Sequence, residues 1–130
     1  MATGIASGQA DAILDAYCRS VAYSDPAGFF LKLHTGDPGA SGASNAFGDT
    51  TRQAATFSAS SGGAITTSAD ITWTSVSTTG TVSHISFWSA SSAGTFLGSD
   101  DLASSKGLNA GDNFTIAAGD LDITLGTVAA

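Results

Sequence analysis

The sequence predicts a mainly β fold, an antiparallel β-sandwich or jelly-roll-like domain with one N-terminal α-helix. Three observations lead to this class. A helical pattern of apolar residues occurs once, near the start of the chain, and strand-like alternation follows it. Turns rich in Gly, Ser and Asp separate the alternating segments. The 130 residues are 42% hydrophobic, enough for one packed core. We therefore expect a flexible arm over residues 1–8 and one domain over residues 9–130.

The helix is predicted over residues 9–22, and the chain reversal at Ser24-Asp25-Pro26 closes it, because the residue before a proline avoids helical angles. A helix of this length is marginal on its own, so its apolar stripe must be covered by the sheet or by another subunit. Cys18 lies on this stripe, which favours an inert, buried thiol. The residues expected to make assembly contacts are Ile13, Leu14, Tyr17 and Val21.

A strand is predicted over residues 28–34, with Leu31 and Leu33 on one face and Lys32 and His34 on the other. Residues 36–51 form a long connection of small residues. Connections of this length inside a compact domain are either functional or mobile, so this one is interpreted as a contact surface or as a disordered loop. The residues expected to be exposed on it are Asp37, Pro38, Asn45 and Phe47.

Further strands are expected over residues 52–59, 64–66, 69–74 and 81–88. Residues 81–88 are apolar on both faces, which predicts a central strand or one covered by another element such as the helix. Trp88, at its end, is a candidate intersubunit residue. A short hairpin is expected from residues 95–98 and 101–104. The repeat of Ala-Gly-Asp at residues 110–112 and 118–120 predicts two adjacent antiparallel strands at the end of the chain.

The charge distribution excludes several classes of partner. All eleven acidic residues are Asp, only four residues are Lys or Arg, and the net charge is -7. Nucleic-acid binding requires clustered cations, so we expect no nucleic-acid partner. No apolar stretch approaches the roughly 18 residues of a membrane helix, and the start of the chain lacks a secretory signal pattern. We expect a soluble protein, made in the cytoplasm, without a membrane partner.

No constellation of reactive residues is evident. The two histidines, His34 and His84, are about fifty residues apart on predicted strands and have no second ligand at metal-binding spacing. A Gly-x-Ser-x-Gly nucleophile motif is absent. Neighbouring aspartates, such as Asp100 with Asp101, are interpreted as turn and edge residues rather than as a catalytic or calcium pair. We therefore expect no catalytic residue, no metal and no cofactor.

The order of the segments resembles a family of small structural proteins of tailed bacteriophages, described as tail-fibre-like or minor tail proteins. The residues that carry the resemblance are Ala12-Ile13-Leu14-Asp15, Leu33-His34-Thr35-Gly36-Asp37-Pro38-Gly39, Arg52-Gln53-Ala54-Ala55-Thr56-Phe57, Ala69-Asp70-Ile71-Thr72-Trp73, Thr81-Val82-Ser83-His84-Ile85-Ser86-Phe87-Trp88, and the end of the chain from Asn109-Ala110-Gly111-Asp112 through Ala117-Ala118-Gly119-Asp120-Leu121. The resemblance covers nearly the whole chain, from about residue 10 to residue 125.

The resemblance implies a non-enzymatic component of the virion that assembles with other virion structural proteins. By analogy with fibres and decoration proteins we expect a homo-oligomer, with a trimer as the specific expectation. Two alternatives remain open. The short chain, without a repeat that would form a shaft, is also compatible with a capsid decoration or head-spike protein. A carbohydrate-binding module for host recognition would instead require exposed Trp or Tyr platforms.

Overall fold

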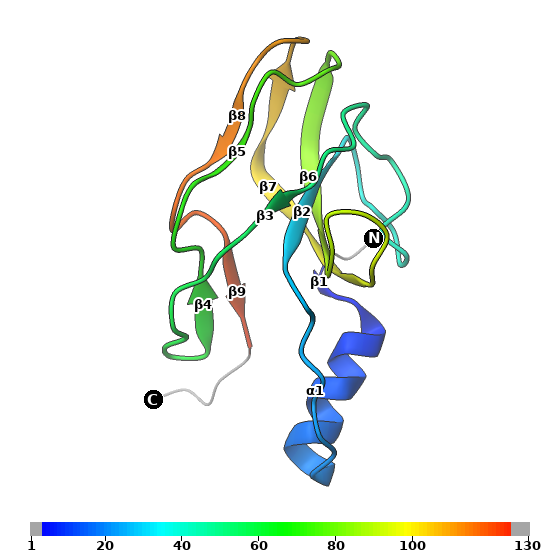
Figure 1. Ribbon diagram of the computed structural model, residues 1–130, viewed down its shortest axis with the longest axis vertical. Coiled ribbons are helices and arrows are strands. Elements are labelled where there is room, and N and C mark those ends of the chain that lie inside the picture. Colours follow the sequence, from blue (N-terminus) through cyan, green and yellow to red (C-terminus); the bar gives the residue numbers. More distant parts are fainter. Residues whose placement is uncertain (1–3, 126–130) are drawn as a thin grey trace.

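A computed structural model describes residues 4–125 of the chain and confirms the predicted fold class (Figure 1). The protein is an antiparallel β-sandwich with one helix. The helix is α1 (Ser7–Arg19). The strands, in chain order, are β1 (Gly4–Ile5), β2 (Phe30–His34), β3 (Gln53–Ala54), β4 (Ala64–Thr66), β5 (Ile71–Trp73), β6 (Gly80–Trp88), β7 (Phe96–Leu108), β8 (Phe114–Ile116) and β9 (Asp122–Thr124).

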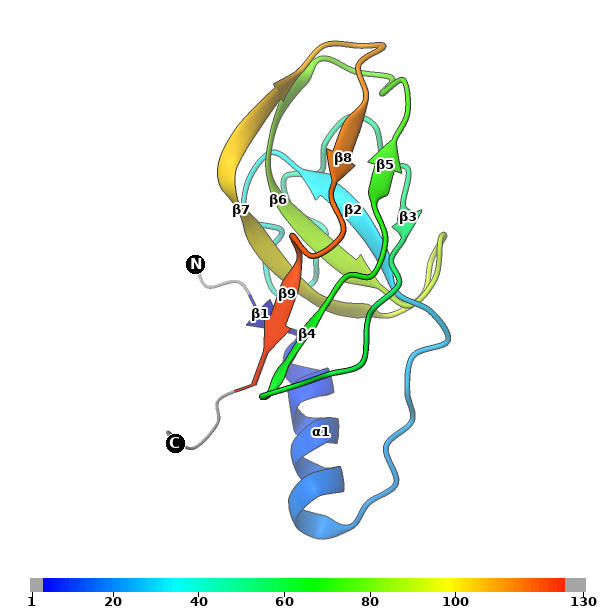
Figure 2. The same ribbon diagram turned by 90° about the vertical axis from the view of Figure 1, so that its left-hand side faces the viewer.

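The strands form two layers. One layer is a five-stranded sheet in the order β1-β7-β6-β2-β3. The other consists of two separate ribbons, β5 with β8 and β4 with β9, which lie across from this sheet (Figure 2). Every pairing in both layers is antiparallel. The predicted alternation of β2 is confirmed, because Leu31 and Leu33 are fully buried in the core between the layers.

The core is filled by side chains from both layers. Trp73 of β5 and Phe114 of β8 lie with their ring centroids 5.7 Å apart, and Trp73 is 1% exposed. Its indole nitrogen donates a hydrogen bond to the carbonyl oxygen of Thr51 (2.9 Å), so the polar end of this buried ring is satisfied. The sheet contributes Val82, Ile85 and Phe87 to the same cluster. The β6–β7 register shifts between Val82 and His84, where β6 advances two residues and β7 five.

Two predictions for the second half of the chain are wrong. The hairpin expected from residues 95–104 does not form, because residues 96–108 make one continuous strand, β7, that pairs with β6. The two strands that follow the Ala-Gly-Asp repeats are not neighbours. Instead, β8 pairs with β5 and β9 pairs with β4, so each tail strand closes a different ribbon.

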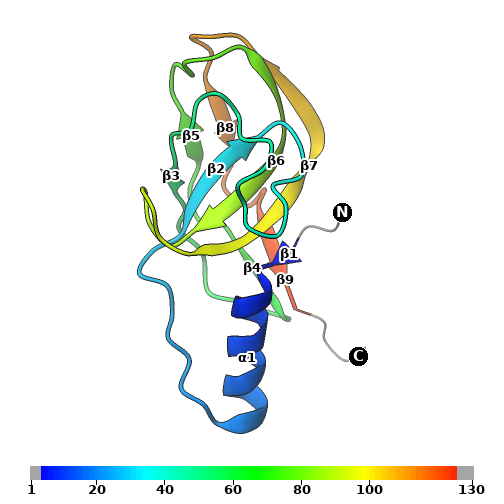
Figure 3. The same cartoon turned by 90° about the vertical axis from the view of Figure 1, so that its right-hand side faces the viewer.

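The helix projects from one end of the sandwich, along the long axis of the molecule (Figures 1 and 3). It begins at Ser7 and ends at Arg19, where Ser20 adopts a left-handed conformation with φ 57°. The helix therefore begins two residues before the predicted range of 9–22 and ends three residues before its end. Within the predicted arm, Gly4 and Ile5 form β1 and pair with β7. Ser7 and Gly8 of the arm belong to α1, and residues 1–3 lie outside the described residues.

Candidate assembly surface

The apolar stripe of α1 is exposed. No residue of the helix is buried. Tyr17 is 89% exposed and Leu14 58%. Val21, which the sequence analysis placed on the stripe, lies beyond the end of α1 at Arg19 and is 46% exposed. Cys18 is exposed as well, so the expectation of a buried thiol is wrong. Leu14 and Tyr17, two residues of the stripe predicted to need a cover, are thus on the surface, whereas Ile13 is half-buried.

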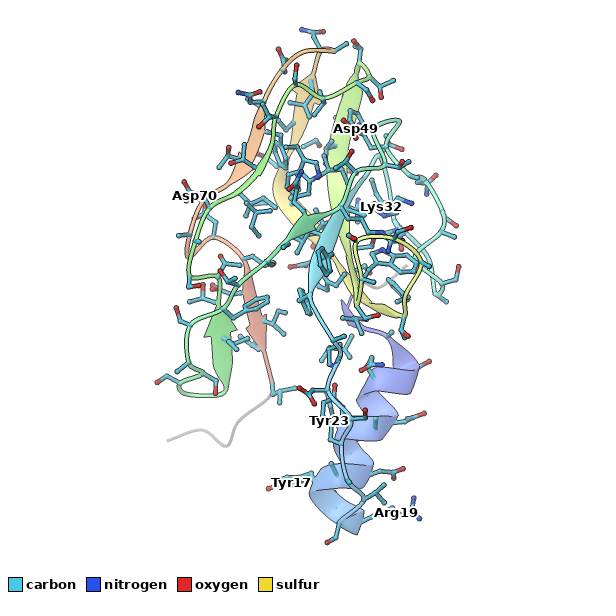
Figure 4. All side chains as sticks on the ribbon, viewed as in Figure 1. Tyr17, Arg19, Tyr23, Lys32, Asp49 and Asp70 are labelled. Atoms are coloured by element: carbon cyan, nitrogen blue, oxygen red, sulfur yellow. The ribbon has the colours of Figure 1, made fainter. Side chains whose placement is uncertain are left out.

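The side of α1 next to these exposed residues is partly covered by the segment that follows the helix. Residues 20–29 run back along the helix toward β2, and Tyr23 donates a hydrogen bond from its hydroxyl to the side-chain oxygen of Gln9 (3.1 Å; Figure 4). Ile13 is half-buried at this side, where it borders a small apolar groove. We call residues 6–29, the helix with its return segment, the N-terminal limb. Of its predicted contact residues, Ile13 faces inward while Leu14, Tyr17 and Val21 are free.

The remaining side of the helix is polar. Arg19 donates a hydrogen bond from Nη1 to Oδ1 of Asp15 (3.0 Å), one helical turn earlier. An exposed pair of this kind stabilises a helix by only about 0.3–0.5 kcal/mol. Ala6, at the N-terminal cap position, provides no side-chain hydrogen bond to the first turn. The helix therefore has weak local support, and its stability depends on packing of its apolar face.

Trp88 belongs to a different region. It lies on the face of the five-stranded sheet that is turned away from the core, where the guanidinium carbon of Arg52 lies 4.1 Å from the centroid of its ring. Arg52 also donates hydrogen bonds to the carbonyl oxygens of Ala90 (2.9 Å) and Ala93 (2.6 Å). Burial, followed by the nearby charge of Arg52, lowers the pKa of Lys32 on the same face. Arg52 thus connects Trp88 to the loop over residues 89–95. Trp88 is not part of the apolar stripe of α1.

The connection over residues 36–51 is an ordered element that packs on this outer face. Asp37 accepts a hydrogen bond from the Gly39 amide at Oδ1 (2.8 Å), and Asn45 donates from Nδ2 to the Asp37 carbonyl oxygen (2.9 Å). Pro38 is buried and Phe47 is 1% exposed, so the prediction that both are exposed is wrong. Phe47 enters the core because its amide bonds to the Leu33 carbonyl (3.0 Å) and holds it beside β2. Of the four predicted residues, Asp37 is half-buried and Asn45 is exposed.

The same connection buries His34 completely and determines its tautomer. A carbonyl oxygen can only accept, so His34 donates from Nδ1 to the oxygen of Ser44 (2.8 Å). Its Nε2 then accepts from the hydroxyl of Ser86 (2.7 Å), and Ser86 in turn accepts from the indole N–H of Trp88 (2.7 Å). Desolvation by burial lowers the pKa of His34, although the hydrogen bond to Ser44 opposes this shift. The imidazole ring is therefore neutral, because Nε2 must be unprotonated to accept a hydrogen bond from Ser86. In this form the ring connects the loop over residues 36–51 to the sheet.

We expect the burial of His34 to make stability depend on pH. The unfolded histidine takes up a proton near pH 6.5 and the folded one does so only at lower pH, so the unfolded state binds more protons in between. This contribution is therefore present above pH 6.5 and is lost as the pH falls below it, at most by about 1.4 kcal/mol per pH unit. Urea unfolding from pH 7 to pH 5 should show a steeper loss for the native chain than for His34→Gln. An equal loss of stability per pH unit in the two proteins would contradict the lowered pKa of His34.

The aspartates mainly support turns. Asp49 accepts hydrogen bonds from the amides of Thr51 (3.0 Å) and Ser77 (3.0 Å), and Asp70 accepts from the amide of Ala118 (2.8 Å; Figure 4). Burial raises the pKa of Asp100, which borders a shallow cleft together with Asp122. Within residues 4–125, no group of three or more His, Cys, Asp or Glu side chains is placed to hold a metal ion. No helix in this range is both long enough and apolar enough to span a membrane.

Comparison with known proteins gives one result for nearly the whole chain. The model of a protein family described as podophage GP4 fiber I protein gp80 matches residues 4–124. The match includes the helix and all nine strands, from β1 to β9. No curated protein matches the chain.

Proposed function

Because the chain belongs to the family of podophage GP4 fiber I protein gp80, we propose that it is a non-enzymatic structural component of a phage tail fibre. The match extends over both the sandwich and the N-terminal limb, so the proposal concerns the whole fold rather than one module. In this role the sandwich provides a rigid body and the limb provides a contact with the rest of the virion.

The observation that carries this proposal is the exposure of α1. A 13-residue helix without a buried residue and without a side-chain cap is not stable through its own hydrogen bonds. Two of its exposed residues, Leu14 and Tyr17, are large and apolar, and exposed apolar patches on folded proteins commonly mark interaction sites. A chain that works through assembly needs such a surface, whereas the hydrogen-bonded His34 and the turn-forming aspartates are already used within the fold.

The tryptophans do not favour the carbohydrate-binding alternative. Trp73 is 1% exposed in the core, and Trp88 is half-buried with Arg52 over its ring. A sugar-stacking platform requires an accessible aromatic face, which neither ring offers. The capsid-decoration alternative involves the same kind of protein contact and differs from a tail fibre only in its position on the particle.

The proposal can be tested by locating the chain on the phage particle. In the phage that encodes this chain, an amber mutation in its gene should yield particles that lack fibre density at the tail in electron micrographs. Mass spectrometry of native particles should detect the chain, and growth in a suppressor host should restore the fibres. Loss of density from the head, with tails unchanged, would support the capsid alternative instead. Absence of the chain from purified native particles would overturn both.

A further inference from the structure

We propose that Lys32 and Arg52, on the outer face of the five-stranded sheet, form a binding site for a carboxylate group that comes from outside the chain. Two of the four Lys and Arg residues of a protein with net charge -7 are placed together here. The inference goes beyond the proposed role in the tail fibre, because that role rests on the N-terminal limb and this site does not.

The two cations lie opposite each other on neighbouring segments of the sheet. β2 pairs with β3 in an antiparallel register that places Leu31 opposite Gln53, and the next step of this register places Lys32 opposite Arg52. Lys32 lies on the outer face, because Leu31 beside it is buried in the core, and Arg52 stacks on Trp88 of the same face (Figure 4). Like charges directly opposite each other destabilise a sheet, so an anion bound beside them would remove an unfavourable interaction.

No carboxylate of the described chain neutralises this pair. The salt bridge found within residues 4–125 joins Arg19 to Asp15, in the helix. Burial, followed by the charge of Arg52, lowers the pKa of Lys32, and no acidic side chain contributes in the opposite direction. The positive charge of the pair is therefore not compensated by the aspartates among these residues.

Both side chains also keep hydrogen-bond donors free. Arg52 uses Nη1 for the carbonyl oxygens of Ala90 and Ala93, whereas its Nε and Nη2, which form one edge of the guanidinium, have no partner within residues 4–125. Nζ of Lys32 has none in that range either. Among the same residues, Oδ2 of Asp37 is the one buried side-chain nitrogen or oxygen atom without a partner, so the free nitrogens of the pair are open to solvent.

The polar groups next to Lys32 are already used within the fold. Ser86 lies opposite Lys32 on β6, but its hydroxyl donates to Nε2 of His34 and accepts from the indole of Trp88. Arg52 is held in place by Trp88 and by its two hydrogen bonds to the loop over residues 89–95. Its free edge is thus fixed before a ligand binds, which reduces the entropy lost on binding.

The geometry of the free donors favours a carboxylate. The two parallel N–H groups on one edge of a guanidinium match the two oxygens of a carboxylate, and the ammonium group of Lys32 adds a second positive charge. Phosphate fits the same edge, but it carries up to two negative charges, and a protein of net charge -7 repels it more strongly. The carboxylate can belong to a free organic acid or to an acidic side chain of a partner protein.

Acetate is the first probe. In a titration at constant ionic strength, with chloride as the reference salt, the Nε–H signal of Arg52 in nitrogen-15 NMR spectra should shift and reach saturation. Lys32→Gln should bind acetate about tenfold more weakly, because it loses a charged donor. Lys106→Gln is the matched control, since it removes the same charge from an exposed position of β7, and it should bind as the native chain does. An unchanged indole signal of Trp73 would show that the core of each variant is intact.

A second probe distinguishes the two sources of the carboxylate. Acetyl-Gly-Asp-Gly-amide presents one aspartate side chain between neutral peptide groups. Tighter binding of this peptide than of acetate would support a partner protein as the source, and equal or weaker binding would support a free organic acid. A shift without saturation, equal affinities of Lys32→Gln and Lys106→Gln, or tighter binding of inorganic phosphate than of both carboxylates would overturn the inference. None of these results depends on where the chain lies in the phage particle, so this test and that of the proposed function can fail separately.

Discussion

Phe47→Ala should destabilise the protein by about 3–5 kcal/mol, the largest effect expected from any single substitution considered. Phe47 is 1% exposed and packs in the core beside β2, although the connection that carries it is rich in small residues. Removal of its ring leaves a cavity that the rigid sheet cannot fill. Since typical domains are stable by only about 5–15 kcal/mol, urea unfolding should show a large loss of the folded state's stability.

Ser41→Ala is the matched control for this substitution. Ser41 is exposed in the same connection, so its replacement should change the free energy of unfolding by less than about 0.5 kcal/mol. If Phe47→Ala were as mild as Ser41→Ala, the connection would not be part of the core, and the loop would be the mobile surface element that its composition suggests.

Gly42→Ala should be the second most disruptive change. Gly42 has φ 71°, and an added Cβ would overlap the ring of Phe96 at Cδ1 and lie 3.0 Å from Cζ2 of Trp88. The backbone conformation alone disfavours a side chain by about 1–2 kcal/mol. Displacement of Phe96, whose ring centroid is 5.5 Å from that of Trp88, should add about 1–3 kcal/mol. Thermal unfolding would measure the loss of stability, and tryptophan fluorescence would report the displacement of the ring beside Trp88.

Gly62→Ala separates the two causes. Gly62 has a similar φ of 60° but open space around the added Cβ. It should therefore show the backbone effect without the displacement of the rings, and leave the fluorescence of Trp88 unchanged. Equal destabilisation by the two substitutions would mean that the loop over residues 36–51 does not press on the outer face of the sheet.

The helix α1 and the strand β2 could be predicted from the sequence because the spacing of apolar residues within each segment indicates its secondary structure. The alternation around Leu31 and Leu33 gave the core face of β2, and the spacing of Leu14 and Tyr17 gave the apolar stripe of α1. The pairing of distant segments has no such local signal. The Ala-Gly-Asp repeats resemble two turns of one meander, yet β8 and β9 lie in different ribbons because their partners, β5 and β4, come from the middle of the chain.

The position of residues 36–51 could not be read from their composition either. Small residues are typical of mobile loops, but here they allow a close approach of the backbone to Trp88 and Phe96. One available signal was missed: His34 is a polar residue within a strand pattern, and buried polar groups need partners. In the structure it lies on the same sheet face as Ser86 and Trp88. The carbonyl of Ser44, in the loop, is the partner that completes this network. The exposure of Cys18 was missed because the stripe was expected to be covered.

The most direct test of the central claim is amide hydrogen exchange of α1 in two states of the protein, the dilute isolated chain and the purified phage tail. If the limb is a surface that assembly covers, the amides of residues 10–19 should exchange rapidly in the isolated chain and be strongly protected in the tail. The amides of β6 should be protected in both states and serve as the internal reference. Equal protection of α1 in the two states would contradict the claim, since the helix would then be stable without a partner.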